Sequence, residues 1–179
     1  MLIAALAFNV SFGQKMMNEK TVVVGGAVMY PSKNIVENAV NSKDHTTLVA
    51  AVKAAGLVET LMSAGPFTVF APTNEAFNLL PAGTVETLVM PANKAKLTGI
   101  LTYHVIAGKL DSKNLEAKIK AGNGTAELIT VAGGKLLVMK KGSKIWLKDE
   151  NGGMAKIKIK DVNQSNGVIH VIDHVVLPK

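Results

Sequence analysis

The 179-residue sequence contains no cysteine. Without a thiol, the chain can form no disulfide bond, no thiolate metal site and no cysteine nucleophile, so three kinds of chemistry are excluded at once. Aromatic residues are also scarce, at 4% of the chain. Because 48% of the residues are nevertheless hydrophobic, we expect a core built mainly from valine, leucine, isoleucine and alanine, with methionine filling irregular gaps.

Arginine is the second missing residue type: the 20 basic residues are all lysines, against 13 acidic residues, which leaves a net charge of +7. Proteins that read DNA sequence depend on arginine, whose planar fork holds guanine or phosphate with two hydrogen bonds. The chain is therefore not expected to recognise nucleic acid specifically. Its charge instead predicts diffuse attraction to acidic polymers or surfaces.

Much of the positive charge lies in residues 135–160, where eight lysines accompany only two acidic residues. Two interpretations remain open for this stretch. It is either a binding face for acidic polymers or a solvated strand face whose lysines deter edge-to-edge aggregation.

The length suits one domain with a well-buried core. Residues 1–14 are uncharged and mostly apolar. They are too short to cross a bilayer, so no membrane span is expected, and they are typical of the centre and cleavage region of an export signal. The alternative is an N-terminal strand or helix that packs on the domain. We expect residues 15–30 to form a linker and residues 31–179 to form the folded domain.

Helical and strand patterns occupy different halves of that domain. Apolar residues recur at helical spacing through much of residues 32–62 and 73–101. Residues 67–71 and 103–107 are predicted strands, and residues 126–162 contain alternating segments separated by glycine turns. Residues 168–177 are apolar on both faces, as in a central strand. This arrangement predicts an α+β fold.

Three short segments carry a family resemblance: Gly65–Phe77, Tyr103–Ile106 and Asn166–Pro178. Together they resemble the two end motifs and the central Tyr-His motif of the fasciclin (FAS1) domain family, over roughly residues 31–178. The resemblance implies an α+β wedge of two β-sheets with helices along one side. It also implies an extracellular module that takes part in cell adhesion and matrix contacts.

Within these segments, we predict structural roles for the residues that hold the strands and turns together. These are Thr68, Phe70, Pro72, Thr73, Asn74, Phe77, Asn166, Gly167, His170 and Asp173.

The Tyr-His segment has two interpretations. The resemblance suggests Tyr103 and His104 as a contact surface for proteins, with their side chains on opposite faces of a strand. The alternative is a structural His104, a neutral imidazole hydrogen-bonded to the backbone or to the turn at Thr73 and Asn74.

His170 and His174 are spaced to lie on one face of the predicted last strand. Zinc needs further ligands and a polar surrounding shell, whereas the neighbours here are aliphatic. We therefore expect no metal and no cofactor, and a buried neutral role at least for His170.

Trp146 shares a predicted strand face with lysines, while Ile145 and Leu147 face the core. Such an indole is suited to stacking on a sugar ring or on a protein partner. The alternative is an indole that lies flat on its own sheet under lysine side chains. The predicted polysaccharide face consists of Lys144, Trp146, Lys148, Lys156, Lys158 and Lys160.

No motif of a common enzyme class is visible: the chain lacks the Gly-x-Ser-x-Gly elbow and a phosphate-binding loop. We predict a non-catalytic binding module, secreted, periplasmic or at the cell surface, that recognises extracellular proteins or acidic polysaccharides. One alternative is a secreted hydrolase, which requires a deep pocket lined by a histidine of perturbed pKa beside a serine or carboxylate. The other is a carrier of a small apolar ligand, which requires an enclosed apolar cavity. The oligomeric state is left open.

Overall fold

The computed structural model describes residues 19–179. The helices are α1 (Ile35–Ala39), η1 (Lys43–His45), α2 (Thr46–Ala55), α3 (Val58–Met62), α4 (Asn74–Asn78), α5 (Thr84–Leu88), η2 (Pro91–Asn93), α6 (Lys94–Tyr103) and α7 (Ser112–Ala121). The strands are β1 (Val22–Val24), β2 (Ala27–Met29), β3 (Phe67–Pro72), β4 (Val105–Ala107), β5 (Thr125–Ile129), β6 (Lys135–Lys141), β7 (Lys144–Lys148), β8 (Met154–Gln164) and β9 (Gly167–Ile172).

A sheet with the strand order β4-β3-β9-β8-β7-β6-β5 forms the body of the domain, and β1 and β2 form a separate hairpin. Within the large sheet β3 and β9 run parallel, while the other neighbouring strands are antiparallel. The long strand β8 joins two halves, because its start pairs with β7 and the rest pairs with β9.

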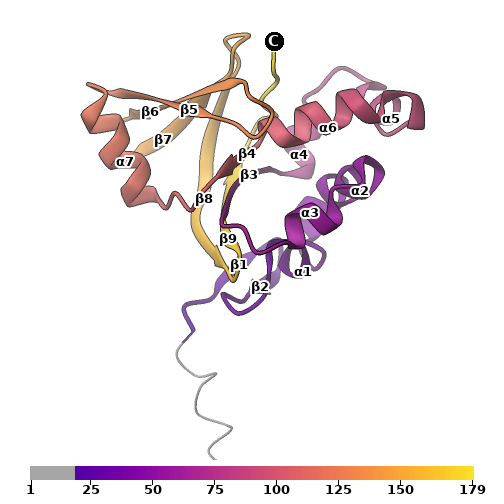
Figure 1. Ribbon diagram of the computed structural model, residues 1–179, viewed down its shortest axis with the longest axis horizontal. Helices are drawn as coiled ribbons and strands as arrows, with labels where there is room; N and C mark the ends of the chain where they lie inside the picture. Colours follow the sequence, from indigo (N-terminus) through magenta and orange to yellow (C-terminus); the bar gives the residue numbers. More distant parts are fainter. Residues whose placement is uncertain (1–18) are drawn as a thin grey trace, which may run out of the picture.

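Irregular backbone in β8 separates these two halves. The register shifts between Ile157 and Ile159 and again between Ile159 and Val162. Asp161 also adopts a left-handed φ of 60°. Bulges of this kind bend a strand and increase its twist. The halves therefore diverge as the two sides of a wedge (Figure 1), which confirms the predicted α+β wedge.

Two apolar clusters stabilise the wedge. One lies between α1–α6 and the face of β3 and β9 that carries Val69 and Ile169. The other fills the wedge interior with Phe70 and Ile172, and α7 contributes Leu115 to it. Figure 1 shows α1–α6 on one side of β3 and β9, with α7 beside β5–β7. Strands β3 and β9 are thus buried on both faces, as their sequences predict.

Side-chain caps fix where several helices begin. Asn34 and Glu37 form a reciprocal capping box at the start of α1, and Asp111 accepts a hydrogen bond from a backbone N–H in the first turn of α7. Such caps satisfy donors that have no partner within the helix. No helix among residues 19–179 is long and apolar enough to cross a membrane.

The structure differs from the sequence-based prediction in three segments. Tyr103 ends helix α6, and His104 caps it, so the predicted strand begins only at Val105. The predicted linker contains the hairpin β1–β2, which adds Val24 and Met29 to the core. Strand β9 ends at Ile172 rather than continuing to residue 177. The predicted export segment, residues 1–14, lies outside the described residues.

Candidate functional site

Asn166 connects the last strand to two helices far away in the sequence. Its Oδ1 accepts a hydrogen bond from the Ile35 N–H at 3.0 Å, and its Nδ2 donates to the Leu61 and Ser63 carbonyls at 2.7 and 2.8 Å. The next residue, Gly167, lies against β3 so closely that no Cβ fits there. Both residues therefore have structural roles in this geometry.

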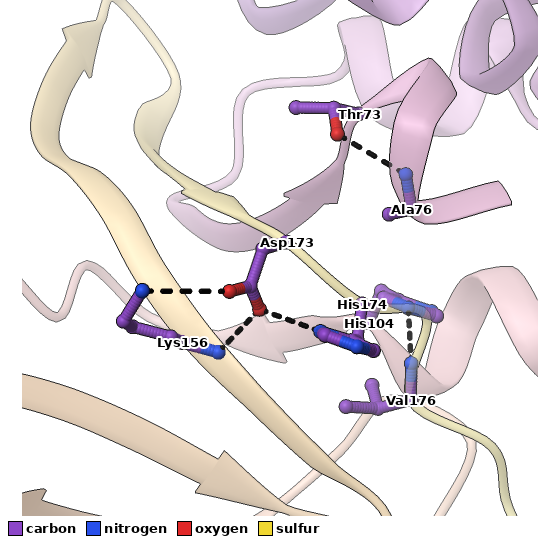
Figure 2. Close-up of polar contacts among 7 residues, drawn as sticks. All are labelled: Thr73, Ala76, His104, Lys156, Asp173, His174 and Val176. Carbon is purple, nitrogen blue, oxygen red and sulfur yellow. Dashed lines mark hydrogen bonds and ion pairs between the residues drawn. The ribbon is translucent and has the colours of Figure 1, made fainter. Parts of the chain in front are cut away.

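The Thr73-Asn74 turn performs a similar task at the other end of β3. The Thr73 Oγ1 accepts from the Ala76 N–H at 3.2 Å and caps α4 (Figure 2). The Asn74 side chain accepts from the Thr47 N–H at 3.0 Å and donates to the Lys43 carbonyl at 2.9 Å. These bonds hold α4 against the start of α2.

The other residues of the first end motif that were predicted to have structural roles, Thr68, Phe70, Pro72 and Phe77, are buried. The Thr68 Oγ1 donates to the Gly108 carbonyl at 2.7 Å and accepts from the Leu110 N–H at 2.8 Å. Pro72 ends β3, and Phe77 is buried in the core between helices and sheet.

Tyr103 is fully buried. Its hydroxyl donates to the Lys135 carbonyl at 2.6 Å and accepts from the Glu150 N–H at 3.3 Å. Burial raises the pKa of Tyr103 to about 12. The phenol therefore links α6 to the β5–β7 half of the sheet. The prediction that Tyr103 belongs to a contact surface is wrong, because its side chain does not reach solvent.

His104 is also internal, at 3% exposure. Its Nδ1 donates to the Ile100 carbonyl at 2.8 Å, and its Nε2 accepts from the Val176 N–H at 3.2 Å (Figure 2). Burial lowers the pKa of His104 to about 4, although the Ile100 carbonyl opposes this shift. The neutral, backbone-bonded imidazole matches the structural alternative. The prediction that this side chain forms a surface contact is therefore wrong.

His170 lies inside the wedge, stacked on Phe70 with ring centroids 5.7 Å apart. Its Nε2 donates to the Leu110 carbonyl at 2.7 Å, and its Nδ1 accepts from the Asp161 N–H at 3.3 Å. Burial lowers the pKa of His170. Because one ring nitrogen donates and the other accepts, these hydrogen bonds require the neutral imidazole. The Asp161 carboxylate is bonded to Ser112 instead of to the imidazole. Although a serine, a histidine and an aspartate meet here, the imidazole cannot take the serine proton as a hydrolytic triad requires.

His174 does not share a strand face with His170, contrary to the prediction, because β9 ends before it. The side chain is 51% exposed and its Nδ1 lies 2.8 Å from the Asp173 Oδ1 (Figure 2). Asp173 also accepts from the Lys156 N–H at 2.7 Å, which ties the chain after β9 to β8. Within residues 19–179 no group of three or more histidine and carboxylate side chains is placed to hold a metal ion.

His45 was not singled out from the sequence, although its place directly before the apolar helix α2 marks it as a buried position. It is 3% exposed and its Nδ1 lies 2.9 Å from the Ser42 Oγ. Burial lowers its pKa, against a smaller opposite effect of the Ala71 carbonyl. His45 lines an apolar cavity, but Ser42 is not among the lining residues. A serine nucleophile therefore does not face the space in which a substrate would lie.

Trp146 lies on the outer face of β7, whereas Ile145 and Leu147 are buried on the inner face, as the alternation predicts. The indole is half-buried. The Lys141 and Lys156 ammonium groups lie 5.5 and 5.7 Å from its ring centroid, within the range of cation–π contacts.

The neighbours of Trp146 on this side of the sheet are mostly basic. Pairing places Lys141 beside Lys144, and Lys148 and Lys156 lie on the same face of β7 and β8. We call this surface, formed by Lys141, Lys144, Trp146, Lys148 and Lys156, the Trp146 face.

Two of the predicted lysines do not belong to the Trp146 face. Lys158 lies farther along β8, where it borders a surface hollow with Asp44 and Glu75. Lys160 lies near Asp161 and His170, on the side toward α7. The alternation assumed from the sequence is wrong at Lys160, because the register shift before Ile159 places Ile159 on the helix side and Lys160 on the side of His170.

Comparison with known proteins gives consistent results. The family profile described as the fasciclin domain matches residues 43–178. Protein sll1483 of Synechocystis sp. is 47% identical over 169 residues, which are 94% of this chain and 87% of that protein. Immunogenic protein MPB70 of Mycobacterium bovis is 36% identical over 145 residues, 78% of this chain and 66% of that protein.

A longer animal protein and a solved structure are also similar. The transforming growth factor-beta-induced protein ig-h3 of Sus scrofa is 40% identical over 131 residues, 73% of this chain but only 17% of that protein. The FAS1 domain pair of the insect cell adhesion molecule fasciclin I superposes with a TM-score of 0.72 at 20% identity, covering 83% of this chain and 52% of the other.

Proposed function

The chain belongs to the fasciclin domain family, and on this basis we propose that it is a non-catalytic adhesion module that acts outside the cytoplasm. In this proposal the protein is secreted, periplasmic or held at the cell surface, and it attaches to acidic extracellular polymers, either polysaccharides or the acidic surfaces of matrix proteins. A cell adhesion molecule is among the structures that share its fold.

The observation that carries this proposal is the Trp146 face. It combines one half-buried indole with four lysines on adjacent strands. The two ammonium groups near the ring place positive charge beside the indole, and the charge of Lys156 is partly balanced by the Asp173 carboxylate at 3.9 Å. An aromatic surface surrounded by cations can stack on a sugar ring while it attracts sulfate or carboxylate groups.

The neutral histidines support a non-catalytic role. In His104 and His170, both ring nitrogens form hydrogen bonds with backbone groups. A general base needs a nitrogen free to reach the proton that it removes. Imidazoles used in this way serve as internal links between distant strands and helices.

Binding to immobilised heparin and alginate, a sulfated and a carboxylated polysaccharide, tests the Trp146 face. The double variant Lys144→Glu/Lys148→Glu is expected to lose at least about tenfold in affinity at about 50 mM NaCl, because both substitutions replace attraction by repulsion. Affinity of the unmodified protein is expected to fall at about 300 mM NaCl, where screening is stronger. Trp146→Ala is expected to weaken binding at both salt concentrations, since stacking is not screened.

The matched control is Lys118→Glu/Lys120→Glu, which makes the same change in net charge at two exposed positions of α7. It is expected to weaken binding only about two- to threefold, through net charge alone. Equal losses in the two double variants would show that attraction is diffuse and would refute a defined site. A single module binds weakly, so the measurement uses a dense polysaccharide surface, on which multivalent contact raises the apparent affinity.

A further inference from the structure

The outer face of strands β6–β8 carries apolar side chains between its lysines. Met139 lies directly opposite Trp146 in the pairing of β6 with β7, while Leu137 and Met154 both lie opposite Lys148. Opposite and diagonal side chains on one face of a sheet are close enough to interact. The four apolar residues are all half-buried. We call this group, Leu137, Met139, Trp146 and Met154, the apolar strip.

No helix in the described part of the chain, residues 19–179, covers the apolar strip. Helix α7 packs on the opposite, inner face of β5–β7, where Leu115 and Ile119 join the buried side chains of these strands. On the outer face of β5–β7 every side chain is exposed or half-buried. Apolar surface that stays uncovered and is bordered by polar residues is typical of an interaction site.

Lysines border the apolar strip, and some of their charge is unbalanced. Glu127 lies 3.3 Å from the Lys135 ammonium group, and Asp173 lies 3.9 Å from that of Lys156. The lysines of this face that form no ion pair within residues 19–179 are Lys141, Lys144 and Lys148. Because two of these three alternate with the indole along β7, unbalanced positive charge lies on both sides of the ring.

The spacing of these charges indicates what the face binds. Lys144 and Lys148 are four residues apart on one strand, a separation of about 13 Å in an extended chain. An extended partner segment has the same spacing, since its side chains alternate between two faces. Carboxylates at positions i and i+4 of the segment meet the two lysines, and an apolar side chain at position i+2 meets the apolar strip.

The apolar strip suits side chains of a protein better than it suits other partners. The flexible thioethers of Met139 and Met154 adapt to apolar side chains of different shapes. A polysaccharide can stack one sugar ring on the indole, but it leaves these thioethers and Leu137 against hydroxyl groups. A lipid surface meets the exposed lysines before it reaches the half-buried strip. A second copy of this chain brings like charges together, which is unfavourable.

We propose that the apolar strip and the lysines around it bind an extended acidic segment of a partner protein, in which carboxylate and apolar side chains alternate on one face. The carboxylates pair with Lys144 and Lys148, and the apolar side chain between them packs on Met139 and Trp146. This inference rests on the proposed adhesion role and names the partner of the same surface.

Three fluorescein-labelled peptides test this inference by fluorescence anisotropy. The acidic leucine peptide repeats Glu-Thr-Leu-Thr, the serine peptide replaces each leucine by serine, and the glutamine peptide replaces each glutamate by glutamine. The acidic leucine peptide is expected to bind about tenfold more tightly than the serine peptide, because its leucines bury apolar surface on the strip. The glutamine peptide is expected to bind about tenfold more weakly at about 50 mM NaCl and to be insensitive to added salt.

The double variant Met139→Gln/Met154→Gln removes apolar surface but leaves every charge in place. It is expected to bind the acidic leucine and serine peptides equally, while its affinity for heparin changes less than about twofold. The matched control is Met62→Gln/Met90→Gln, at positions that are 45% and 54% exposed in α3 and after α5. This control is expected to keep the full preference for leucine. Both variants are first checked for native circular dichroism.

The proposal is overturned if the unmodified protein binds the acidic leucine and serine peptides equally, or if Met139→Gln/Met154→Gln keeps the preference for leucine. It is also overturned if this variant loses affinity for heparin or for phosphatidylglycerol vesicles as strongly as for the acidic leucine peptide, because the strip then serves a polysaccharide or a lipid surface. Equal binding of the two peptides, with heparin binding that still depends on Lys144 and Lys148, refutes this inference alone and leaves the proposed function standing.

Discussion

Replacement of His104 by alanine tests the central structural claim, that the imidazole is an internal link between α6 and the segment after β9. The substitution removes the donor to the Ile100 carbonyl and the acceptor for the Val176 N–H. It also leaves an empty space at a position that is 3% exposed. The Val176 N–H is then buried without a partner in this structure.

The expected loss of stability follows from these contacts. Each hydrogen bond contributes about 1 kcal/mol, and a buried group left unpaired adds a further penalty. Together with the missing ring, the free energy of unfolding is expected to fall by about 3 kcal/mol. For a domain of this size, each kcal/mol lowers the melting temperature by about 2–4 °C, so we expect a decrease of roughly 6–12 °C.

Urea unfolding followed by circular dichroism at pH 7 measures this change, with His174→Ala as the matched control. The His174 side chain is 51% exposed, and its replacement is expected to change stability by less than about 0.5 kcal/mol. If His104→Ala is no more destabilising than His174→Ala, the structural role is refuted. Unchanged stability together with a loss of ligand binding would instead indicate that His104 is part of a contact surface.

Three further predictions address the same framework. Folding lowers the pKa of His104 from its ordinary value of 6.5 to about 4. Between pH 4 and pH 6.5 the unfolded chain therefore binds more protons than the folded chain, so stability falls as the pH drops from 7 toward 4. His104→Ala is expected to remove about 3 kcal/mol of this pH dependence, and parallel stability-pH curves for the two proteins would contradict it. Asn166→Ala is expected to lower the free energy of urea unfolding by about 3 kcal/mol, since three hydrogen bonds are lost; a loss below about 1 kcal/mol would show that these bonds are easily replaced. Gly167→Ala places a Cβ 2.0 Å from the Phe67 carbonyl oxygen and is expected to lower the free energy of unfolding by about 3 kcal/mol or more. As the control, Gly99→Ala lies in α6, where no atom is within 4 Å of the added Cβ, and it is expected to raise the free energy of unfolding by up to about 1 kcal/mol in the same assay. Similar effects of the two alanines would refute the close contact between β3 and β9.

The α+β order of the elements was predictable because its signals are local, whereas the wedge shape was expected only from the family resemblance. The unbroken apolar run in β9 indicated burial on both faces, and the alternation around Trp146 indicated which side chains face outward. Residues at Thr73 and Asn74 were assigned structural roles from their motif, and their hydrogen bonds agree with such roles. In these cases the period of the chain and the chemistry of one turn decide the outcome.

The predicted surfaces were less reliable, because exposure depends on contacts between distant segments. Tyr103 and His104 were placed on a strand with one side free, but they lie at the end of a helix whose surroundings come from Lys135 and Val176. The register shifts of β8 place Lys160 on the side of His170, away from the Trp146 face. A regular alternation of lysine and isoleucine in the sequence does not indicate such a shift.

The sequence by itself determined the composition of the core, the α+β order of the elements and the absence of thiol chemistry, because each follows from residue types or from their spacing along the chain. Only the tertiary structure decided which imidazole nitrogens have partners. The Nε2 acceptor of His104 and the N–H donor of Val176 are brought together across 72 positions of sequence, and the Nε2 of His170 meets the Leu110 carbonyl across 60. The spacing of residues specifies helices and strands, but the partner of a buried polar atom depends on how those elements pack.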